Sequence, residues 1–195
     1  MNLPRYRIPQ WRFWLPLILQ TGLIMAVPAR AFYTYVSGET VVLQTVPVDP
    51  YDLLRGYSQT LRYDISNLDR FKNLPGWEEL NATRSNGRPF YVILEAPKSA
   101  NTKPPLAWQP VAVSSNLPDN LPDNRIPLEG TIYYNSVRYG LETYYMPEDR
   151  RNKINAEINN LNFQNRRPFV VEVKIDSQGK AVPISLWIED RNYRF

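Results

Sequence analysis

The chain has 195 residues, of which 43% are hydrophobic and 22% charged, as is ordinary for one globular domain that buries a core without metals or disulfides. It contains no cysteine and no histidine, which excludes disulfides, thiolate nucleophiles, Cys/His zinc sites and Ser-His-Asp triads. The 13 tyrosines, 7 phenylalanines, 5 tryptophans and 18 prolines, against 8 glycines, favour short strands and many corners, and therefore a mainly β fold.

The formal net charge of +4 comes entirely from the N-terminus. Residues 1–31 hold four arginines and no acid, so residues 32–195 carry 19 basic and 19 acidic side chains. A neutral domain lacks the sustained basic face that neutralises phosphates. We therefore expect no nucleic-acid binding.

The first predicted element is a membrane anchor. Three arginines precede an uncharged run of 17 residues, Phe13 to Ala29, and Arg30 follows it. The positive-inside rule places the N-terminus in the cytoplasm and the rest of the chain across the membrane. The run is at the lower limit for a span, but it lengthens if Arg30 snorkels and the aromatic-rich segment of residues 31–36 forms an interfacial belt.

A cleaved signal peptide is the alternative to this anchor. Ala29-Arg30-Ala31 has the small-x-small form of a signal-peptidase site, so release of a secreted domain after Ala31 stays open, although we favour a retained anchor. The predicted organisation is a cytoplasmic N-terminus and anchor in residues 1–31, followed by one extracytoplasmic domain in residues 32–195. That domain would lie on the periplasmic, luminal or extracellular side.

Two strands, residues 38–46 and 57–65, are predicted on either side of a corner with the sequence VPVDPYDLLRG. The corner has the signals of a single capped helical turn: an N-cap, a proline at the first helical position, a capping-box acid and a terminating glycine. These four residues are Asp49, Pro50, Asp52 and Gly56. We interpret the stretch as structural before it is anything else.

A weak internal repeat follows. LRYDI and RPFYVILEA (residues 61–65 and 88–96) in the first half resemble VRYGLE and RPFVVEVKI (residues 137–142 and 167–175) in the second. Each RPF strand is followed by a return strand, and each half has a helix-prone insert. The repeat predicts two strand, helix, strand, strand units within a compact antiparallel, mainly β (α+β) domain.

The two inserts are not equivalent. The second predicts a helix near residues 147–162, with acids in its first turn and apolar residues on one face. The first, residues 67–86, is interrupted by LPGW and predicts two short turns.

A proline-rich link, residues 116–127, joins the two units. Its clustered oxygen side chains are of the kind that binds calcium. However, their spacing matches no calcium loop, and Pro, Asp and Asn are typical of surface turns. The clustered residues are Asp119, Asn120, Asp123 and Asn124. We expect no metal site and no cofactor.

The corner and its following strand resemble the GDYXXLXY family, largely uncharacterised bacterial proteins named for that motif. The match runs from Pro47 to Tyr63, with Tyr57 and Ser58 where the family has Asp-Tyr. A second segment, YGLETYYMPED with its Gly140, is similar to a pattern in the C-terminal half of such proteins. The resemblance implies a membrane-anchored extracytoplasmic protein that works beside multi-spanning membrane proteins, and it implies no established activity.

Seven residues are candidates for binding a protein partner. Arg55 could pair across the fold with Glu142 or Glu148, either as a buried structural fork or as an exposed anchor. The tyrosines would form an aromatic patch if one face of the sheet presented them together, and core packing is the alternative. The candidates are Arg55, Tyr57, Tyr63, Tyr139, Glu142, Tyr144 and Tyr145.

The leading functional hypothesis is an accessory or scaffold protein that presents its β domain to a larger membrane protein complex. Two enzymatic alternatives stay open. One is a carboxylate-dependent cell-wall or glycan hydrolase that uses Glu142 and Glu148, with Tyr144 and Tyr145 as a sugar platform. The other is a Ser/Lys hydrolase based on Ser37. We assign no catalytic residue.

Overall fold

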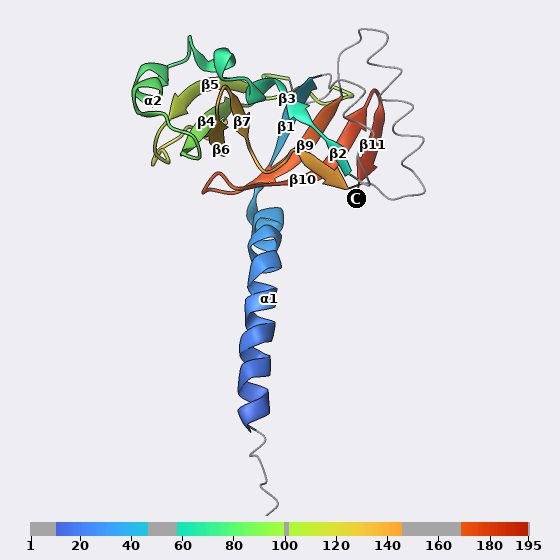
Figure 1. The fold of residues 1–195 in the computed structure, drawn as a ribbon. Helices are drawn as coiled ribbons and strands as arrows, with labels where there is room; N and C mark the ends of the chain where they lie inside the picture. Colours follow the sequence, from blue (N-terminus) through green and yellow to red (C-terminus); the bar gives the residue numbers. More distant parts are fainter. Residues whose placement is uncertain (1–10, 47–57, 100–101, 146–168, 195) are drawn as a thin grey trace, which may run out of the picture.

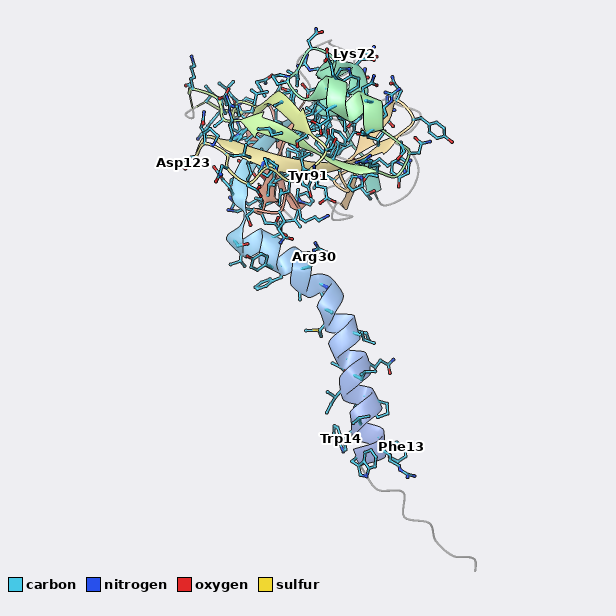
Figure 2. The ribbon with its side chains drawn as sticks, turned by 90° about the vertical axis from the view of Figure 1, so that its left-hand side faces the viewer. Phe13, Trp14, Arg30, Lys72, Tyr91 and Asp123 are labelled. Carbon is cyan, nitrogen blue, oxygen red and sulfur yellow. The ribbon has the colours of Figure 1, made fainter. Side chains whose placement is uncertain are left out.

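The structure is a computed structural model that describes residues 11–46, 58–99, 102–145 and 169–194. A long helix, α1 (Trp11–Ser37), projects from a β-rich body (Figure 1). It contains Pro28, which lacks the N–H for one helical hydrogen bond and whose ring crowds the preceding turn. The helix accordingly bends by 42° between Trp11–Ala26 and Pro28–Ser37, and Figure 2 shows the change of direction close to Arg30.

Helix α1 is a candidate membrane span only when both of its arms are counted. Among the described residues, no single straight helix has the length and hydropathy to cross a bilayer, whereas the two arms of α1 qualify when they are taken together across the bend.

The body contains two antiparallel sheets and a short ladder. One sheet has the order β11-β10-β9-β1-β3, the other has the order β5-β4-β6-β7, and β2 pairs with β8. The strands are β1 (Glu39–Val46), β2 (Ser58–Thr60), β3 (Arg62–Tyr63), β4 (Pro89–Glu95), β5 (Gln109–Ser114), β6 (Arg125–Tyr133), β7 (Ser136–Arg138), β8 (Thr143–Tyr145), β9 (Val170–Ile175), β10 (Ala181–Ile188) and β11 (Arg191–Arg194). Short helical turns η2 (Asp64–Ser66) and η3 (Leu68–Phe71) and the helix α2 (Trp77–Thr83) lie between β3 and β4.

The predicted mainly β fold is confirmed, with corrections to individual elements. The strand predicted over residues 57–65 is wrong as one piece, because it is divided into β2, β3 and the turn η2. The first insert does form short helical pieces. The corner at residues 47–56 and the helix near 147–162 lie outside the described residues.

Strand β6 was missed because Pro127 and Gly130 interrupt its sequence, and both residues weaken strand predictions. Pro127 is tolerated because β7 pairs only with residues 131–133 of β6. Within the part of the chain that the structure describes, no second strand therefore pairs with β6 at Pro127, where the N–H is missing.

The two C-terminal hairpins of the predicted repeat have the same irregularity. The β4–β5 hairpin skips Val111 just after Pro110, and the β9–β10 hairpin skips Ile184 just after Pro183. A bulge accommodates a proline that cannot contribute a ladder donor. The two copies of the sequence repeat therefore also share a bulge at the equivalent place, one residue after a proline.

The two predicted units do not form separate sheets. β1, from the first half, pairs with β9, and β6, from the second half, pairs with β4. Each sheet thus joins strands of both halves. The core between them contains fully buried side chains from both sheets, including Leu43, Phe90, Leu128 and Val171.

Helix α1 is fixed to the body at its last turn. Thr34 is buried, and its hydroxyl donates to Asp176 Oδ2 at 2.6 Å. Gly38, the residue between α1 and β1, donates its N–H to the Thr34 carbonyl at 2.9 Å and accepts from Lys174 Nζ at 2.9 Å. A Cβ at Gly38 would lie 2.5 Å from the Thr34 oxygen and 2.9 Å from the Ile175 oxygen. Only glycine fits this junction.

Candidate functional site

The two copies of the repeated Arg-Tyr segment meet at the centre of the body, in a contact between residues 61–65 and 137–142 that we call the seam. The Tyr63 hydroxyl donates to the Leu141 carbonyl at 2.9 Å, and the Tyr139 hydroxyl donates to the Ile65 carbonyl at 2.6 Å. Each tyrosine therefore binds the residue two positions after the other. Such reciprocity is what a local two-fold relation between the copies produces.

Both seam tyrosines are buried, with 1% of Tyr63 and 8% of Tyr139 exposed. Burial raises the pKa of the Tyr139 hydroxyl well above its usual value, and the nearby Asp64 and Glu142 carboxylates raise it further. The hydroxyl is thus kept neutral as a hydrogen-bond donor. The predicted aromatic patch is consequently not presented by these two side chains, and core packing accounts for them.

Glu142 closes the turn that follows Tyr139. Its Oε1 accepts the Tyr139 N–H at 2.5 Å, and its backbone carbonyl accepts the Leu61 N–H at 2.6 Å. Gly140 supports the turn with a φ of 75°, in the left-handed region that favours glycine. The Glu142 carboxylate therefore has a structural role in the seam.

The remaining predicted residues are distributed as follows. Tyr144 and Tyr145 lie in β8, where their backbones pair with Gln59 and Ser58 of β2. The others lie outside the described residues: Asp49, Pro50, Asp52, Arg55, Gly56, Tyr57 and Glu148. The proposed pairing of Arg55 with either glutamate stays a prediction.

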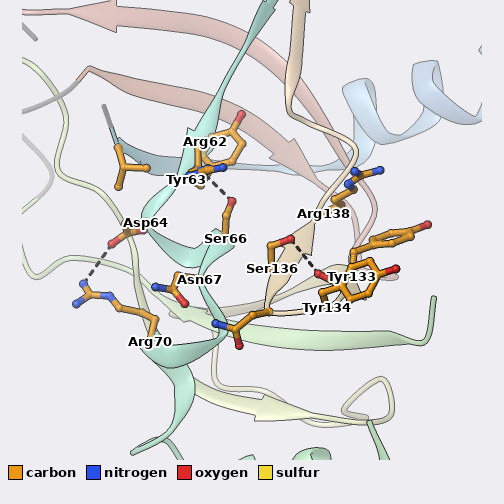
Figure 3. A pocket seen from close by; sticks show the side chains of 12 residues that line it. Arg62, Tyr63, Asp64, Ser66, Asn67, Arg70, Tyr133, Tyr134, Ser136 and Arg138 are labelled. Atoms are coloured by element: carbon orange, nitrogen blue, oxygen red, sulfur yellow. Dashed lines mark hydrogen bonds and ion pairs between the residues drawn. The ribbon is translucent and has the colours of Figure 1, made fainter. Parts of the chain in front are cut away.

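A pocket of about 830 Å³ lies beside the seam, between the η2–η3 segment and the β6–β7 hairpin. Figure 3 shows Arg138 and Tyr133 on one side of it and the Asp64–Arg70 pair on the other. Its volume is within the range of ligand-binding pockets. The charged and aromatic side chains in its lining are Arg62, Tyr63, Asp64, Arg70, Tyr133, Tyr134 and Arg138.

The pocket has an excess of positive charge. Among the described residues of its lining, the single carboxylate, Asp64, forms an ion pair with Arg70 at 3.2 Å. Burial raises the pKa of the Asp64 carboxyl, and the Arg70 guanidinium opposes that increase. The guanidinium of Arg138 lies 4.6 Å from the centre of the Tyr133 ring, within the range of a cation–π contact.

The β6–β7 hairpin displays an unusual tyrosine at its tip. Tyr134 is 83% exposed and has a φ of 54°. Its N–H donates to Asn86 Oδ1 at 2.8 Å, and the Asn135 carbonyl accepts the Leu68 N–H at 3.5 Å. The hairpin is thus tied to the segments on both sides of α2.

Sequence reasoning missed Tyr133, Tyr134 and Arg138 as site residues. The signal was present in the repeat, because Arg62 and Arg138 occupy the same position in LRY and VRY. The exposure of Tyr134, in contrast, depends on a turn that has neither of the usual Asn-Gly or Asp-Gly signatures.

A second pocket, of about 380 Å³, shares Tyr133 and Arg138 with the first and is also lined by Glu142. Lys180 and Glu129 form an ion pair in its wall.

Among the described residues, no group of three or more acidic side chains is placed to hold a metal ion. Within the proline-rich link, Asn124 donates to Glu95 Oε1 at 3.1 Å.

Comparison with known proteins gives one match. A protein-family model described as GDYXXLXY protein matches residues 20–186. This range begins within α1 and ends in β10, so it includes the seam and the lining of both pockets. No curated protein and no solved structure matches the chain.

Proposed function

Since this chain belongs to the GDYXXLXY protein family, we propose that it is a membrane-anchored accessory or scaffold protein. Its β-rich body stands on the periplasmic, luminal or extracellular side and binds a larger membrane protein or complex. The N-terminus stays in the cytoplasm.

The observation that carries this proposal is the apolar surface of α1. The large hydrophobic side chains on the surface of α1 have between 52% and 68% of their area exposed. Leaving so much contiguous apolar surface in water is unfavourable by about 25 cal/mol per Å². At 27 residues the helix is about 40 Å long, against a hydrocarbon core of about 30 Å. The hydrocarbon core of a bilayer would remove this apolar surface from water.

The charge distribution supports the orientation. Arg5, Arg7 and Arg12 precede the apolar run, whereas Arg30 alone follows it before the body begins. Positive charge concentrates on the cytoplasmic side of a span. The body that follows is neutral overall, as suits a role in contacting protein rather than nucleic acid.

An accessory role is also supported by the use of polar groups in the seam. Tyr63, Tyr139 and Glu142 are engaged with backbone groups of the opposite or the same copy. These side chains stabilise the contact between the two halves. They are therefore poor candidates for acid–base chemistry on a substrate.

The orientation can be tested with single cysteines, because the chain has none of its own. Lys98→Cys places a thiol on an exposed loop of the body, and Asn2→Cys places one at the N-terminus. In intact cells or spheroplasts, a membrane-impermeant maleimide should label the first variant and not the second. Labelling of Asn2→Cys alone contradicts the proposed topology, and a mature N-terminus at Phe32 contradicts the anchor.

The binding role requires a separate experiment. The full-length chain should be purified from native membranes in several mild detergents after brief crosslinking. We expect a membrane protein to co-purify at a constant ratio. Recovery of the isolated chain in every detergent contradicts an accessory role.

A further inference from the structure

We propose that the 830 Å³ pocket beside the β6–β7 hairpin binds an acidic segment of the partner protein. Arg62 and Arg138 pair with its carboxylates, and Tyr134 packs against it. This inference rests on the proposed accessory function, and it specifies the surface and the chemistry by which the partner is recognised.

The charges of the pocket are the first argument. Of the described residues, three arginines and one carboxylate line it, and the carboxylate, Asp64, forms an ion pair with Arg70. Arg62 and Arg138 are exposed, and neither forms an ion pair with a carboxylate of the described residues. A guanidinium presents a planar set of donors that matches a carboxylate. Two such groups in one pocket favour an occupant with more than one acid.

The geometry around Arg138 is the second argument. Its guanidinium lies over the Tyr133 ring, with Cζ 4.6 Å from the ring centre, and a cation–π contact uses the charge of the guanidinium without requiring its N–H donors. Because the side chain is already held, less conformational entropy is lost when it binds a carboxylate.

Tyr134 is the third argument. A positive φ is uncommon for a tyrosine, and strained backbone of this kind concentrates at functional sites. Here it places an aromatic ring in solvent, with 83% exposed, on a hairpin fixed by Asn86 and by the Leu68 N–H. Tyrosine and arginine on a rigid support are the residues that dominate protein interfaces.

The position of Tyr134 favours a polypeptide over a small anion. Because Tyr134 is 83% exposed, a small anion held by the arginines would leave most of its side chain in water. The site also lies beside Val46, at the end of β1 farthest from α1. In the proposed orientation this end faces away from the bilayer, so the headgroups of the anchoring membrane do not reach it.

The direct test uses the full-length chain in detergent micelles. The probe is the labelled peptide Glu-Leu-Glu-Glu-Leu-Glu, and its glutamine counterpart is the control ligand. We expect the acidic peptide alone to bind, by fluorescence anisotropy, and binding to weaken as salt increases. The double variant Arg62→Gln/Arg138→Gln and the variant Tyr134→Ala should each weaken binding roughly fivefold or more.

A control variant tests whether the loss of a positive charge elsewhere on the body weakens binding. Arg194→Gln removes one arginine charge from an exposed position in β11 and should change binding less than about twofold. Thermal unfolding checks that each variant is folded. Equal binding of both peptides, or full binding by the Arg62/Arg138 double variant, overturns the inference. Polygalacturonate that binds in place of the peptide overturns it as well, because the ligand is then an acidic glycan.

Co-purification from native membranes distinguishes the two proposals. Loss of the partner from the double variant, with retention by Arg194→Gln, supports both. A partner retained by the double variant overturns this inference and leaves the accessory role standing. If the chain binds the acidic peptide but no partner co-purifies with it in any detergent, the accessory role is contradicted and the pocket is still supported as a site for acidic segments.

Discussion

At the scale of single residues, the seam depends on a few hydrogen bonds made by buried side chains. Tyr63 and Tyr139 each contribute a hydroxyl to a carbonyl of the other copy, at 2.9 and 2.6 Å. Because both carbonyls are in the interior, no solvent can replace a lost donor. The hydroxyls therefore affect stability far more than the exposed hydroxyl of Tyr134.

We expect Tyr139→Phe to lower the free energy of unfolding by about 1–2 kcal/mol, since it leaves the Ile65 carbonyl without its donor. Tyr63→Phe should have a similar effect. Urea unfolding of the full-length chain, followed by tryptophan fluorescence, measures both. Tyr134→Phe is the control and should be neutral; a Tyr139→Phe variant as stable as this control would contradict the assigned role.

Asp64 gives the pocket a specific pH dependence. Burial raises the pKa of its carboxyl despite the neighbouring Arg70. A carboxyl whose pKa is raised by folding stabilises the protein below its unfolded-state pKa, and that contribution is lost as the pH rises through the folded-state pKa. We expect Asp64→Asn to be at least as stable as the parent at pH 7, and to lose that relative advantage as the pH falls to about 4.

Asp69→Asn is the matched comparison, because hydrogen bonding and charge from Lys72 lower the pKa of the Asp69 carboxyl. Its relative stability should change with pH in the opposite direction. Denaturant unfolding of both variants across this pH range measures the two trends, and parallel trends would contradict the assignment for Asp64.

At the scale of elements, the junction between α1 and β1 has no linker. Gly38 is the single residue between helix and strand, and its neighbours are backbone atoms that cannot rotate away. The buried bond from Thr34 to Asp176 fixes the last turn of the helix to the body. Helix and sheet therefore meet in one defined geometry.

Gly38→Ala should lower the free energy of unfolding by about 1–3 kcal/mol, because the added Cβ would lie 2.5 Å from the Thr34 carbonyl oxygen. Thermal unfolding and limited proteolysis in detergent measure the effect. Gly22→Ala is the control within the same helix, since no atom lies within 4 Å of its added Cβ. Equal behaviour of the two variants would show that the junction tolerates rearrangement.

The elements also show where sequence patterns suffice. β1, β4 and β9 follow alternating or β-branched runs, and each was predicted within a few residues. β5 and β10 are the return strands predicted after the two RPF strands. β6 was missed because Pro127 and Gly130 weaken a strand prediction. The strand nevertheless forms, since β7 does not reach Pro127 and pairs only with residues 131–133. The seam residues Tyr63, Tyr139 and Glu142 stood out through their motifs, but their burial and partners follow from contacts between distant segments.

At the scale of the whole molecule, the two halves exchange strands. β1 completes the sheet of β9 and β10, and β6 completes the sheet of β4 and β5. Local periodicity specifies that a segment is a strand, but it carries no information about which strand lies beside it. For this reason the repeat was predictable from LRY and RPF, whereas the mixed composition of both sheets was not.

The exchange predicts that neither half folds alone. Fragments 1–116 and 117–195 should each fail to show cooperative unfolding in detergent, because each would expose the unpaired edge of its central strand. Co-expressed, they should purify as a 1:1 complex with strand content close to that of the intact chain by circular dichroism. A cooperative transition in either isolated fragment would contradict this.

The linker-free junction has a mechanical consequence. β1 spans 8 residues, or about 26 Å, from Gly38 to the rim of the large pocket. A body attached without a hinge rotates with its helix, so tilting α1 by about 10° would move that rim by about 4–5 Å. If the helix spans a bilayer as proposed, changes in bilayer thickness that alter its tilt also displace the proposed partner-binding surface. Conversely, a partner that binds this surface restricts the tilt of the helix.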